Sequence, residues 1–349
     1  MSSRLLVICQ KVDENDDLLG FFVSWIREFA SHYDRVTVIT MAKGEYTLPV
    51  NVRVVSLGKE EHLPKWRQAF RFIHVLWREV RAHDAVFTHM SPIFAIAAWP
   101  YTFIWHKKLV LWYLHRSRTL KLRFALALVD TLVTADSESL TIRSPKIVAV
   151  GHGIDIARFA VPDRMPPAER PSHILSVGRL SPIKGFETLI HAVERLRKNG
   201  VICEVRIVGK AVMPNDQKYE EQLRALVARL GVGDVMHFFG FVPYRDVPSH
   251  YRWADVVVGC TPPGGIDKAI LEGMAAACAV VTSNAVMRKY FVPAYADEYI
   301  FRYGDPMELA DKLERIFAAD LRSIGTDMQR VVARDHNLPI TIRKIISLL

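Results

Sequence analysis

Residues 174–185 read Ile-Leu-Ser-Val-Gly-Arg-Leu-Ser-Pro-Ile-Lys-Gly, and a pattern typical of a helix follows them. The apolar run Ile174–Val177 predicts a buried strand, and the glycines at 178 and 185 allow tight turns after it. Arg179 and Lys184 place two cations on one loop at the end of that strand. Two cations held in this way suit a diphosphate. Taken alone, the stretch is equally compatible with a solvated loop that carries two incidental basic residues.

Short β-branched and apolar runs alternate with longer helical patterns on both sides of this stretch. The helical patterns include Glu187–Lys198, Asp216–Leu230 and Pro306–Ala318. Before the stretch, strands are expected at Leu5–Cys9, Val36–Thr40, Val52–Leu57, Ala85–Thr88, Leu109–Leu114, Leu132–Ala135 and Ile147–Val150. From the stretch onward, they are expected at Ile174–Val177, Val205–Val208, Met236–Phe239, Val256–Val258, Ala279–Thr282 and Tyr299–Phe301.

A proline-rich segment at Ala160–Ser172 interrupts the alternation and has the composition of a linker. Because parallel strands need crossover helices, each half is predicted to form a doubly wound parallel sheet. The expected domains are residues 1–160 and 161–335, with a helix at 336–349 that packs back on the first domain. Ligands bind at the carboxyl ends of strands in such sheets, so a site is expected in the cleft between the domains.

A second loop, Thr261–Lys268, reads Thr-Pro-Pro-Gly-Gly-Ile-Asp-Lys and opens a helix after the strand at Val256. Such a turn leaves backbone N–H groups and the positive end of the helix dipole available to an anion. Glu272 follows within an otherwise apolar part of the helix. Because a buried carboxylate is costly without a partner, Glu272 is predicted to bind a ligand such as the vicinal diol of a ribose; the alternative is a surface glutamate.

These loops resemble those of the retaining GT-B glycosyltransferases of family 4, enzymes that use nucleotide sugars. The resemblance is specific from Gly151 to about Leu313. It rests on the loop Gly151–Asp155, on Gly178-Arg179 with Lys184-Gly185, on Leu271–Ala275 and on the segment from Phe238 to Asp255. It implies an α/β fold of two Rossmann-like domains that face each other across a cleft, the first binding the acceptor and the second the donor.

The resemblance also implies a role for each motif. Arg179 and Lys184 would bind the donor diphosphate and stabilise it as it leaves, Glu272 would hold the ribose, and the backbone at Phe241 and Val242 would receive the base. Further candidates for donor contacts are Gly178, Gly209, Gly264, Gly265, Ile266, Asp267 and Lys268. The acceptor hydroxyl would attack the front face of the sugar, assisted by the departing phosphate. No metal or other cofactor is expected, since the nucleotide sugar is a substrate and the chain's own cations serve the phosphate.

One position departs from the family pattern. The first glutamate of the Glu-x7-Glu signature, which in the family touches the donor sugar, would fall at Gly264. Asp267 and Lys268 are charged where the family usually has small or apolar residues, so they are candidates to take over the sugar contacts.

The loop after the first expected strand is acidic. Asp16 and Asp17 are predicted to cap a helix at Leu18–Ser31. The alternative is that Asp13, Asp16 or Asp17 accepts a hydroxyl or an amine of the acceptor, with Gly20 as a further candidate for acceptor contacts.

Three histidines, His89, His115 and His152, follow expected strand ends. A lone histidine there is usually structural, whereas three favour a role in the site for at least one of them. By resemblance, His89 is the candidate catalytic histidine, positioning the sugar or shuttling a proton. Candidates for acceptor or interdomain contacts are His115, Gly151, His152, Gly153 and Asp155.

An amphipathic basic helix is predicted at Leu63–His83. Trp66, Phe70, Ile73 and Trp77 form an apolar stripe, and basic side chains occupy the other faces. The stripe is predicted to pack on the sheet; the alternative is a dock for an anionic membrane or a lipid-phosphate acceptor.

Composition excludes disordered and fibrous classes, because 50% of the 349 residues are hydrophobic. The net charge of +9 suits anionic partners, but no nucleic-acid recognition motif is found, so no nucleic acid is expected. No apolar run is long enough for a signal peptide or a membrane span. Four widely separated cysteines favour a reducing compartment. We expect a cytoplasmic protein with peripheral contact at the inner face of the plasma membrane.

The expected function is transfer of a hexosyl group from a nucleotide-diphosphate sugar, such as a UDP or GDP sugar, to a sugar or lipid-linked acceptor hydroxyl in polysaccharide or glycolipid biosynthesis. Two alternatives stay open. One is an epimerase or phosphorylase of related architecture. The other is a degenerate nucleotide-binding subunit, which Gly264 favours.

Overall fold

The chain folds into two compact units. The computed structural model describes residues 3–16, 18–116, 118–161, 171–293 and 296–349. Unit 1 comprises Met1–Gly153, Pro243–Arg245 and Asn337–Leu349, and unit 2 comprises Ile154–Val242 and Asp246–His336. The chain first passes from unit 1 to unit 2 after Gly153, a few residues before the expected boundary at 160. Most of the proline-rich linker lies outside the described residues.

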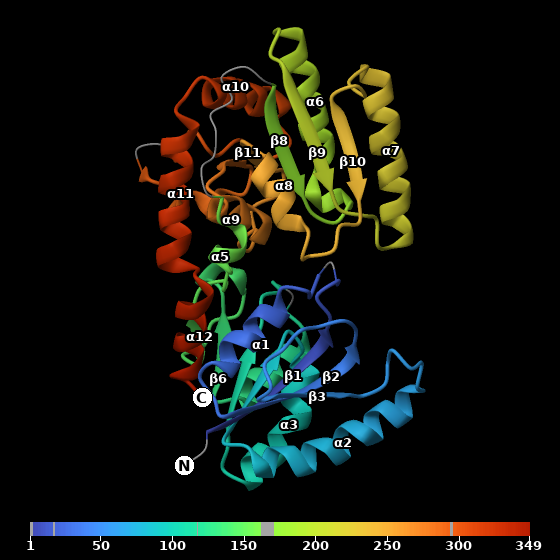
Figure 1. Ribbon diagram of the computed structural model, residues 1–349, viewed down its shortest axis with the longest axis vertical. Coiled ribbons are helices and arrows are strands. Elements are labelled where there is room, and N and C mark those ends of the chain that lie inside the picture. Colours follow the sequence, from blue (N-terminus) through green and yellow to red (C-terminus); the bar gives the residue numbers. More distant parts are fainter. Residues whose placement is uncertain (1–2, 17, 117, 162–170, 294–295) are drawn as a thin grey trace. The chain divides into compact units, whose positions relative to one another are not determined.

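Unit 1 is built on a seven-stranded sheet with the order β3-β2-β1-β4-β5-β6-β7, and its described strand pairs are all parallel (Figure 1). The strands are β1 (Arg4–Val12), β2 (Arg35–Lys43), β3 (Val52–Ser56), β4 (Ala85–His89), β5 (Lys108–Trp112), β6 (Thr131–Thr134) and β7 (Ile147–Ala149). Its helices are α1 (Phe22–Ala30), α2 (Lys65–Ala82), α3 (Pro92–Ile104), α4 (Leu120–Leu128) and α12 (Leu338–Ile346).

Alternate strand residues face opposite sides of this sheet. Leu6 and Val86 belong to the core cluster that α2, α3 and α4 cover. Phe87, the next residue after Val86, instead packs against Phe29 of α1, with ring centroids 5.1 Å apart. Helix α12 packs on α1. The sheet therefore has helices on both faces.

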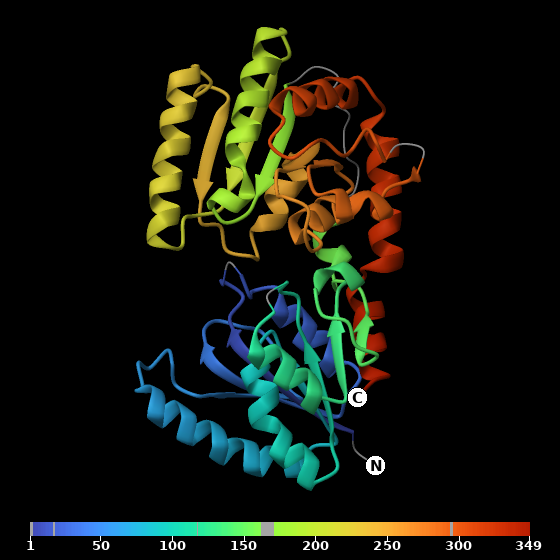
Figure 2. The same cartoon turned by 180° about the vertical axis from the view of Figure 1, so that it is seen from behind.

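Unit 2 has a five-stranded sheet, order β10-β9-β8-β11-β12, again with parallel pairs. Its strands are β8 (Ser172–Val177), β9 (Cys203–Val208), β10 (Met236–Gly240), β11 (Val256–Gly259) and β12 (Ala279–Thr282). Its helices are α5 (Ile156–Phe159), α6 (Phe186–Lys198), α7 (Pro214–Leu230), α8 (Val247–Trp253), α9 (Lys268–Ala275), α10 (Pro306–Phe317) and α11 (Leu321–Asp335). Figure 2 shows α6 and α7 side by side on this sheet.

The predicted fold class is confirmed, and twelve of the expected strands form with ends shifted by three residues at most. Tyr299–Phe301 is the exception, because only Ile300 forms an isolated bridge, with Thr282. The chain turns soon afterwards, at Gly304, which has a φ of +76°. The helix expected to start at Leu18 begins at Phe22.

The prediction that the apolar stripe of α2 packs on the sheet is wrong. Trp66, Phe70, Ile73 and Trp77 are 67%, 72%, 54% and 53% exposed. The helix instead buries a second apolar set, Phe72, Val75, Leu76 and Val80. Both sets have helical spacing, so periodicity alone does not identify the buried one. Within the described part of the chain, the helices are too short or too polar to cross a bilayer.

Candidate functional site

The candidate donor site lies at the topological switch point of unit 2. Strands β8 and β11 are neighbours, and the crossovers lead from β8 toward β9 and from β11 toward β12. Ligands of doubly wound sheets bind where the strand order reverses, outside the carboxyl ends of the strands. The loop Gly178–Gly185 follows β8, and the loop Thr261–Asp267 follows β11. Both sequence motifs therefore lie at the place where the topology predicts a ligand.

Two close backbone approaches position the first loop. The Gly178 N–H donates to the Val208 carbonyl oxygen at 2.9 Å, and a Cβ at Gly209 would lie 1.9 Å from the Gly178 carbonyl oxygen. Only glycine fits at 209, which explains this residue as packing between two loops. Gly185 has a φ of +57° and a Cβ there would lie 2.6 Å from the Cys260 carbonyl oxygen, so the turn before α6 also requires glycine.

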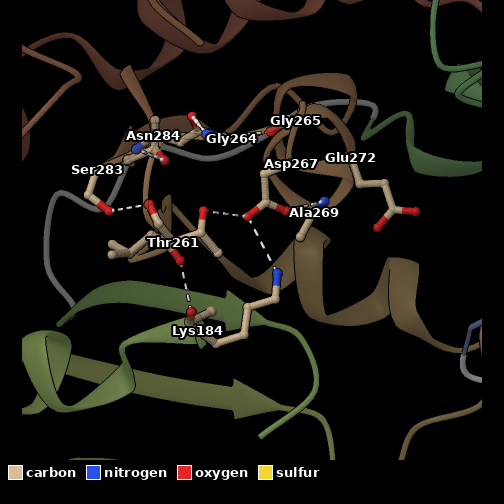
Figure 3. A network of polar contacts seen from close by, with 12 residues as sticks. Lys184, Thr261, Gly264, Gly265, Asp267, Ala269, Glu272, Ser283 and Asn284 are labelled. Atoms are coloured by element: carbon tan, nitrogen blue, oxygen red, sulfur yellow. Dashed lines mark hydrogen bonds and ion pairs between the residues drawn. The ribbon is translucent and has the colours of Figure 1, made fainter. Parts of the chain in front are cut away.

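Both predicted phosphate-binding cations are half-buried or exposed and have an aspartate beside them. Lys184 Nζ lies 3.4 Å from Asp267 Oδ2, as Figure 3 shows, and Arg179 Nε lies 3.6 Å from Asp216 Oδ2. Sequence reasoning missed Asp216, which also accepts a hydrogen bond from the Met213 N–H at the start of α7. The signal available in the sequence was the position of Asp216 in the first turn of a helix that begins with Pro214, where an acidic side chain typically caps.

The second loop is tied to the end of β12. The Gly264 N–H donates to Asn284 Oδ1 at 3.2 Å, and Asn284 Nδ2 donates to the Gly265 carbonyl oxygen at 2.8 Å (Figure 3). The expectation that the Gly264 N–H is available to an anion is therefore wrong, because Asn284 takes it. Asn284 was missed, although its place just after Thr282 at a neighbouring strand end was a signal. Gly265 and Ile266 are half-buried.

Asp267 joins the two loops at the start of α9. Its Oδ1 accepts from the Ala269 N–H at 3.1 Å and so caps the helix, while its Oδ2 accepts from Thr261 Oγ1 at 3.2 Å and faces Lys184. The side chains that the sequence assigned to separate motifs thus meet at one carboxylate (Figure 3).

Glu272 is 4% exposed, and the chain itself supplies its partners. Tyr251 Oη donates to it at 3.1 Å and Lys268 Nζ at 2.5 Å. The argument that this buried carboxylate needs a ligand as its partner is therefore weakened. Lys268 is placed one turn before Glu272 on the same face of α9. Glu272 lies apart from the network around Lys184 in Figure 3.

The expected base-binding segment follows β10. Phe241 is exposed and Val242 is half-buried. Lys210 Nζ lies 4.2 Å from the centroid of the Phe241 ring, a cation–π distance. An exposed ring with a cation over it offers a surface for stacking.

In unit 1, Lys11 pairs with two carboxylates of the acidic loop. Its Nζ lies 2.9 Å from Asp13 Oδ2 and 2.8 Å from Asp16 Oδ2. Partial burial disfavours ionisation of Asp16, but hydrogen bonds from Lys11 and from the N–H groups of Leu19 and Leu18 outweigh it and lower the pKa of Asp16. Asp16 therefore caps the turn ahead of α1, and the prediction that it caps the helix itself is wrong, because the N-cap residue of α1 is Phe21.

Asp17 and Gly20 are the two further candidates of this loop. Asp17 lies outside the described residues. A Cβ at Gly20 would lie 2.6 Å from the Asp16 carbonyl oxygen, which gives Gly20 a packing role.

His89 is 1% exposed and stacks on Phe22 with ring centroids 3.9 Å apart. Burial, and secondly the charge of the neighbouring His152, lower the pKa of His89 to about 3. The imidazole is neutral near pH 7, which argues against the proton shuttle. A positioning role for His89 stays a prediction.

The other two candidate histidines of unit 1 differ in burial. His152 is buried, 6.4 Å from Trp112 between ring centroids, whereas His115 is exposed and lies against Tyr113. Gly151 and Gly153 have φ values of +94° and +69°. The Gly153 carbonyl oxygen accepts from Trp25 Nε1 at 3.0 Å. In unit 2, Asp155 caps α5 by accepting from the Arg158 N–H.

Residues 161–325 match the family model of glycosyl transferases group 1. WcaL of Escherichia coli (strain K12), which its name assigns to colanic acid biosynthesis as a glycosyltransferase, is 29% identical over 58% of this chain and 51% of its own length. A GDP-mannose-dependent phosphatidylinositol monomannoside mannosyltransferase of Mycobacterium tuberculosis is 32% identical over 37% of this chain and 34% of its own. The chain spans about half the length of the first of these curated relatives.

Solved structures support the fold over nearly the whole chain. Alr3699/HepE of Anabaena in complex with UDP has a TM-score of 0.76 at 18% identity, covering 99% of this chain and 98% of its own. Sucrose-phosphate synthase of Thermosynechococcus elongatus has a TM-score of 0.77 at 15% identity, with the same coverage. The fold is thus that of the GT-B glycosyltransferases, and the predicted resemblance to this group is confirmed.

Proposed function

We propose that this chain is a retaining glycosyltransferase that moves a hexosyl group from a nucleoside-diphosphate sugar to a hydroxyl of a sugar or lipid-linked acceptor. The observation that carries the proposal is the pair of cations, Arg179 and Lys184, on the loop at the switch point of unit 2. The group 1 family match over the same residues supports it. Relatives named for colanic acid and mannoside synthesis favour a role in glycan or glycolipid biosynthesis.

The cations suit a diphosphate that becomes more negative during the reaction. Their distances to Asp267 and Asp216, 3.4 and 3.6 Å, are longer than those of strong charged hydrogen bonds. Such loose, partly solvated pairs stabilise little, so a phosphate oxygen competes well for the same cations. Because close backbone contacts hold the loop that carries them, both cations already stand near the diphosphate site and stabilise the leaving group with little reorganisation. The proposal includes no resident metal.

The remaining donor contacts follow from the same two loops. In this proposal Glu272, which the buried Tyr251 hydroxyl positions, holds the ribose, and the exposed ring of Phe241 receives the base. Asp267 and Lys268 stand within four residues of Gly264, which has no side chain of its own to reach a sugar hydroxyl. We therefore assign the sugar contacts to these two residues, and His89 a positioning role.

Retention follows in the proposal from attack on the face that the diphosphate leaves. The departing phosphate then takes the proton of the acceptor hydroxyl, so the step needs no protonated histidine. This agrees with the neutral state of His89 near pH 7. We place the enzyme in the cytoplasm, where nucleotide sugars would serve as donors.

Calorimetric titration of the protein with UDP, GDP, ADP and CMP tests the donor site. We expect one nucleoside diphosphate to bind selectively and Lys184→Ala to weaken it by about 1.5–3 kcal/mol, the contribution of a hydrogen bond to a charged group. Lys198→Ala, at an exposed lysine paired with Glu194, is the matched control and should bind like the parent. Equal affinity in both variants would contradict the phosphate assignment.

The ribose assignment has a separate test. Glu272→Ala should weaken binding of the ribonucleoside diphosphate but change binding of its 2′,3′-dideoxy analogue little, because the analogue lacks the hydroxyls that a carboxylate accepts. A loss of about 1.5–3 kcal/mol is expected for the ribonucleotide. Glu220→Ala, on the exposed side of α7, controls for the lost charge. Equal losses for both ligands would remove Glu272 from the ribose.

A degenerate nucleotide-binding subunit is the second candidate, and Gly264 in place of the signature glutamate favours it. The two candidates separate in one assay of the parent protein with the selected nucleotide sugar and a panel of sugar and lipid-linked acceptors. Transfer supports the enzyme. Tight binding without transfer or donor hydrolysis supports the subunit, and epimerised donor or phosphate-dependent cleavage would indicate the related enzyme classes.

A further inference from the structure

Three neighbouring helices of unit 1 turn large apolar side chains toward solvent. We call this set the α2–α4 surface. Its members are Trp66, Phe70, Ile73 and Trp77 of α2, Ile93, Phe103 and Ile104 of α3, and Leu120 and Phe124 of α4. Helix α3 packs against both α2 and α4, and the Trp77 and Trp105 rings meet edge to face at 4.9 Å. The exposed sides of α2 and α3 are therefore continuous.

These helices contribute mainly other side chains to the core of unit 1. The opposite side of α2, with Phe72 and Leu76, already covers the core of unit 1 together with α3 and α4. Isolated exposed apolar residues are common, but a contiguous set of large ones marks an interaction surface. A partner is therefore expected on the α2–α4 surface.

Charge identifies the chemistry of that partner. Residues 62–129 contain eleven lysines and arginines and two acidic residues, Glu79 and Asp84, an excess equal to the +9 of the whole chain. Glu79 is buried and bonded to Arg53 and Arg78, so it contributes little negative potential. The exposed cations of α2 and α4 are Lys65, Arg67, Arg71, Arg78, Arg81, Lys121 and Arg123. The partner must be anionic.

Tryptophan and phenylalanine flanked by lysine and arginine suit the boundary between lipid headgroups and acyl chains. A second copy of the chain is disfavoured, because two surfaces with the same positive charge repel each other.

We propose that the α2–α4 surface binds unit 1 to a bilayer that contains anionic lipid. Trp66 and Phe70 enter the headgroup region, and the neighbouring cations contact lipid phosphates. This binding needs neither donor nor acceptor, so it is independent of the proposed transferase function.

Flotation of the full chain with vesicles tests the proposal. One set of vesicles contains phosphatidylglycerol and phosphatidylcholine in equal parts, and the other contains phosphatidylcholine alone. The parent protein should bind the anionic vesicles at least tenfold more strongly, since each cation near an anionic surface adds to the attraction. The double variant Trp66→Glu with Phe70→Glu should lose at least tenfold in binding to anionic vesicles.

The double variant Val50→Glu with Ile202→Glu is the matched control. It makes the same change of charge at two strongly exposed apolar residues. Val50 adjoins Asn51, whose side chain bonds the carbonyl groups of Ala30 and Tyr33 at the end of α1, on the other face of the sheet. This control should bind like the parent, and circular dichroism checks that both variants are folded.

Three outcomes would overturn the proposal. The first is failure of the folded parent to bind anionic vesicles, and the second is equal binding by the parent and the Trp66→Glu, Phe70→Glu variant. The third is a parent that sediments as a dimer while that variant sediments as a monomer, which would make a second copy the occupant of this face.

Discussion

The protonation of His89 is set by its surroundings within unit 1. Its ring lies against Phe22, Phe21 and Trp25, and its pKa is lowered to about 3 by burial and then by His152. The ordinary value is 6.5. Between these two pH values the unfolded chain binds more protons than the folded one. The stability that neutral His89 contributes is therefore present above about pH 6.5 and is lost as the pH falls toward 3.

His89→Phe should remove this pH dependence, because phenylalanine keeps an aromatic ring in the cluster but has no proton to bind. Between pH 7 and pH 5, the free energy of unfolding should fall by about 2 kcal/mol more in the parent than in the variant. This figure follows because each pH unit below 6.5 costs the parent about 1.36 kcal/mol. Urea unfolding at both pH values measures this. The two proteins differ only at position 89, so the difference between their falls reports the loss of this imidazole. Equal falls would show that His89 can be protonated within the fold.

The chemistry of individual residues was predicted better than their partners. Arg179 and Lys184 do share the loop after β8, as the spacing of glycines around them indicates. Asp216, which lies beside Arg179, comes from α7, and Asn284, which bonds the second loop, follows β12. No local pattern connects residues so far apart in sequence; only the order of the strands brings them together.

At the scale of elements, strands were predictable and the buried face of a helix was not. Strands in the middle of the sheets, such as β4 and β11, are buried on both sides and read as short apolar runs, which is typical of parallel sheets covered by helices. Helix α2 has two apolar sides, and its Trp66 side has the larger residues. The sequence prediction chose the wrong side, because both sides have helical spacing and only the packed structure shows that Phe72 and Val75 join the core of unit 1.

Turns that contain residues with positive φ could be predicted from the sequence only in part. The glycines at 178 and 185 indicated turns. Met90, directly after His89, also has a positive φ, +61°, but as a methionine it gives no such signal. Its N–H donates to the Trp112 carbonyl oxygen at 2.8 Å, so tertiary contacts hold this strained residue. The end of β4 is thus shaped by β5 rather than by local sequence.

At the scale of the whole molecule, the last helix, α12, stabilises the unit that begins the chain. It belongs to unit 1 although it follows α11 of unit 2, and Ile342 in it is fully buried. Ile342→Ala should destabilise unit 1 by about 2–5 kcal/mol, the range for deleting a buried isoleucine side chain. Tryptophan fluorescence reports this unit selectively, since all tryptophans except Trp253 lie in it.

Ile190→Ala is the control in unit 2, where Ile190 is equally buried in α6. Chemical unfolding should show an earlier fluorescence transition for Ile342→Ala and an unshifted one for Ile190→Ala, whose loss appears instead in circular dichroism. A fluorescence transition that moves only with Ile190→Ala would mean that α12 does not stabilise unit 1.

The return of residues 337–349 to unit 1 has a consequence for synthesis. A ribosome makes residues 154–336 between the main part of unit 1 and the helix that completes it. Unit 2 can finish folding during translation, whereas unit 1 waits with the α1 side that receives α12 uncovered. A premature stop codon anywhere before Leu338 would therefore harm the unit encoded first, and exchange of unit 2 between related genes would have to proceed by insertion rather than by end-to-end fusion.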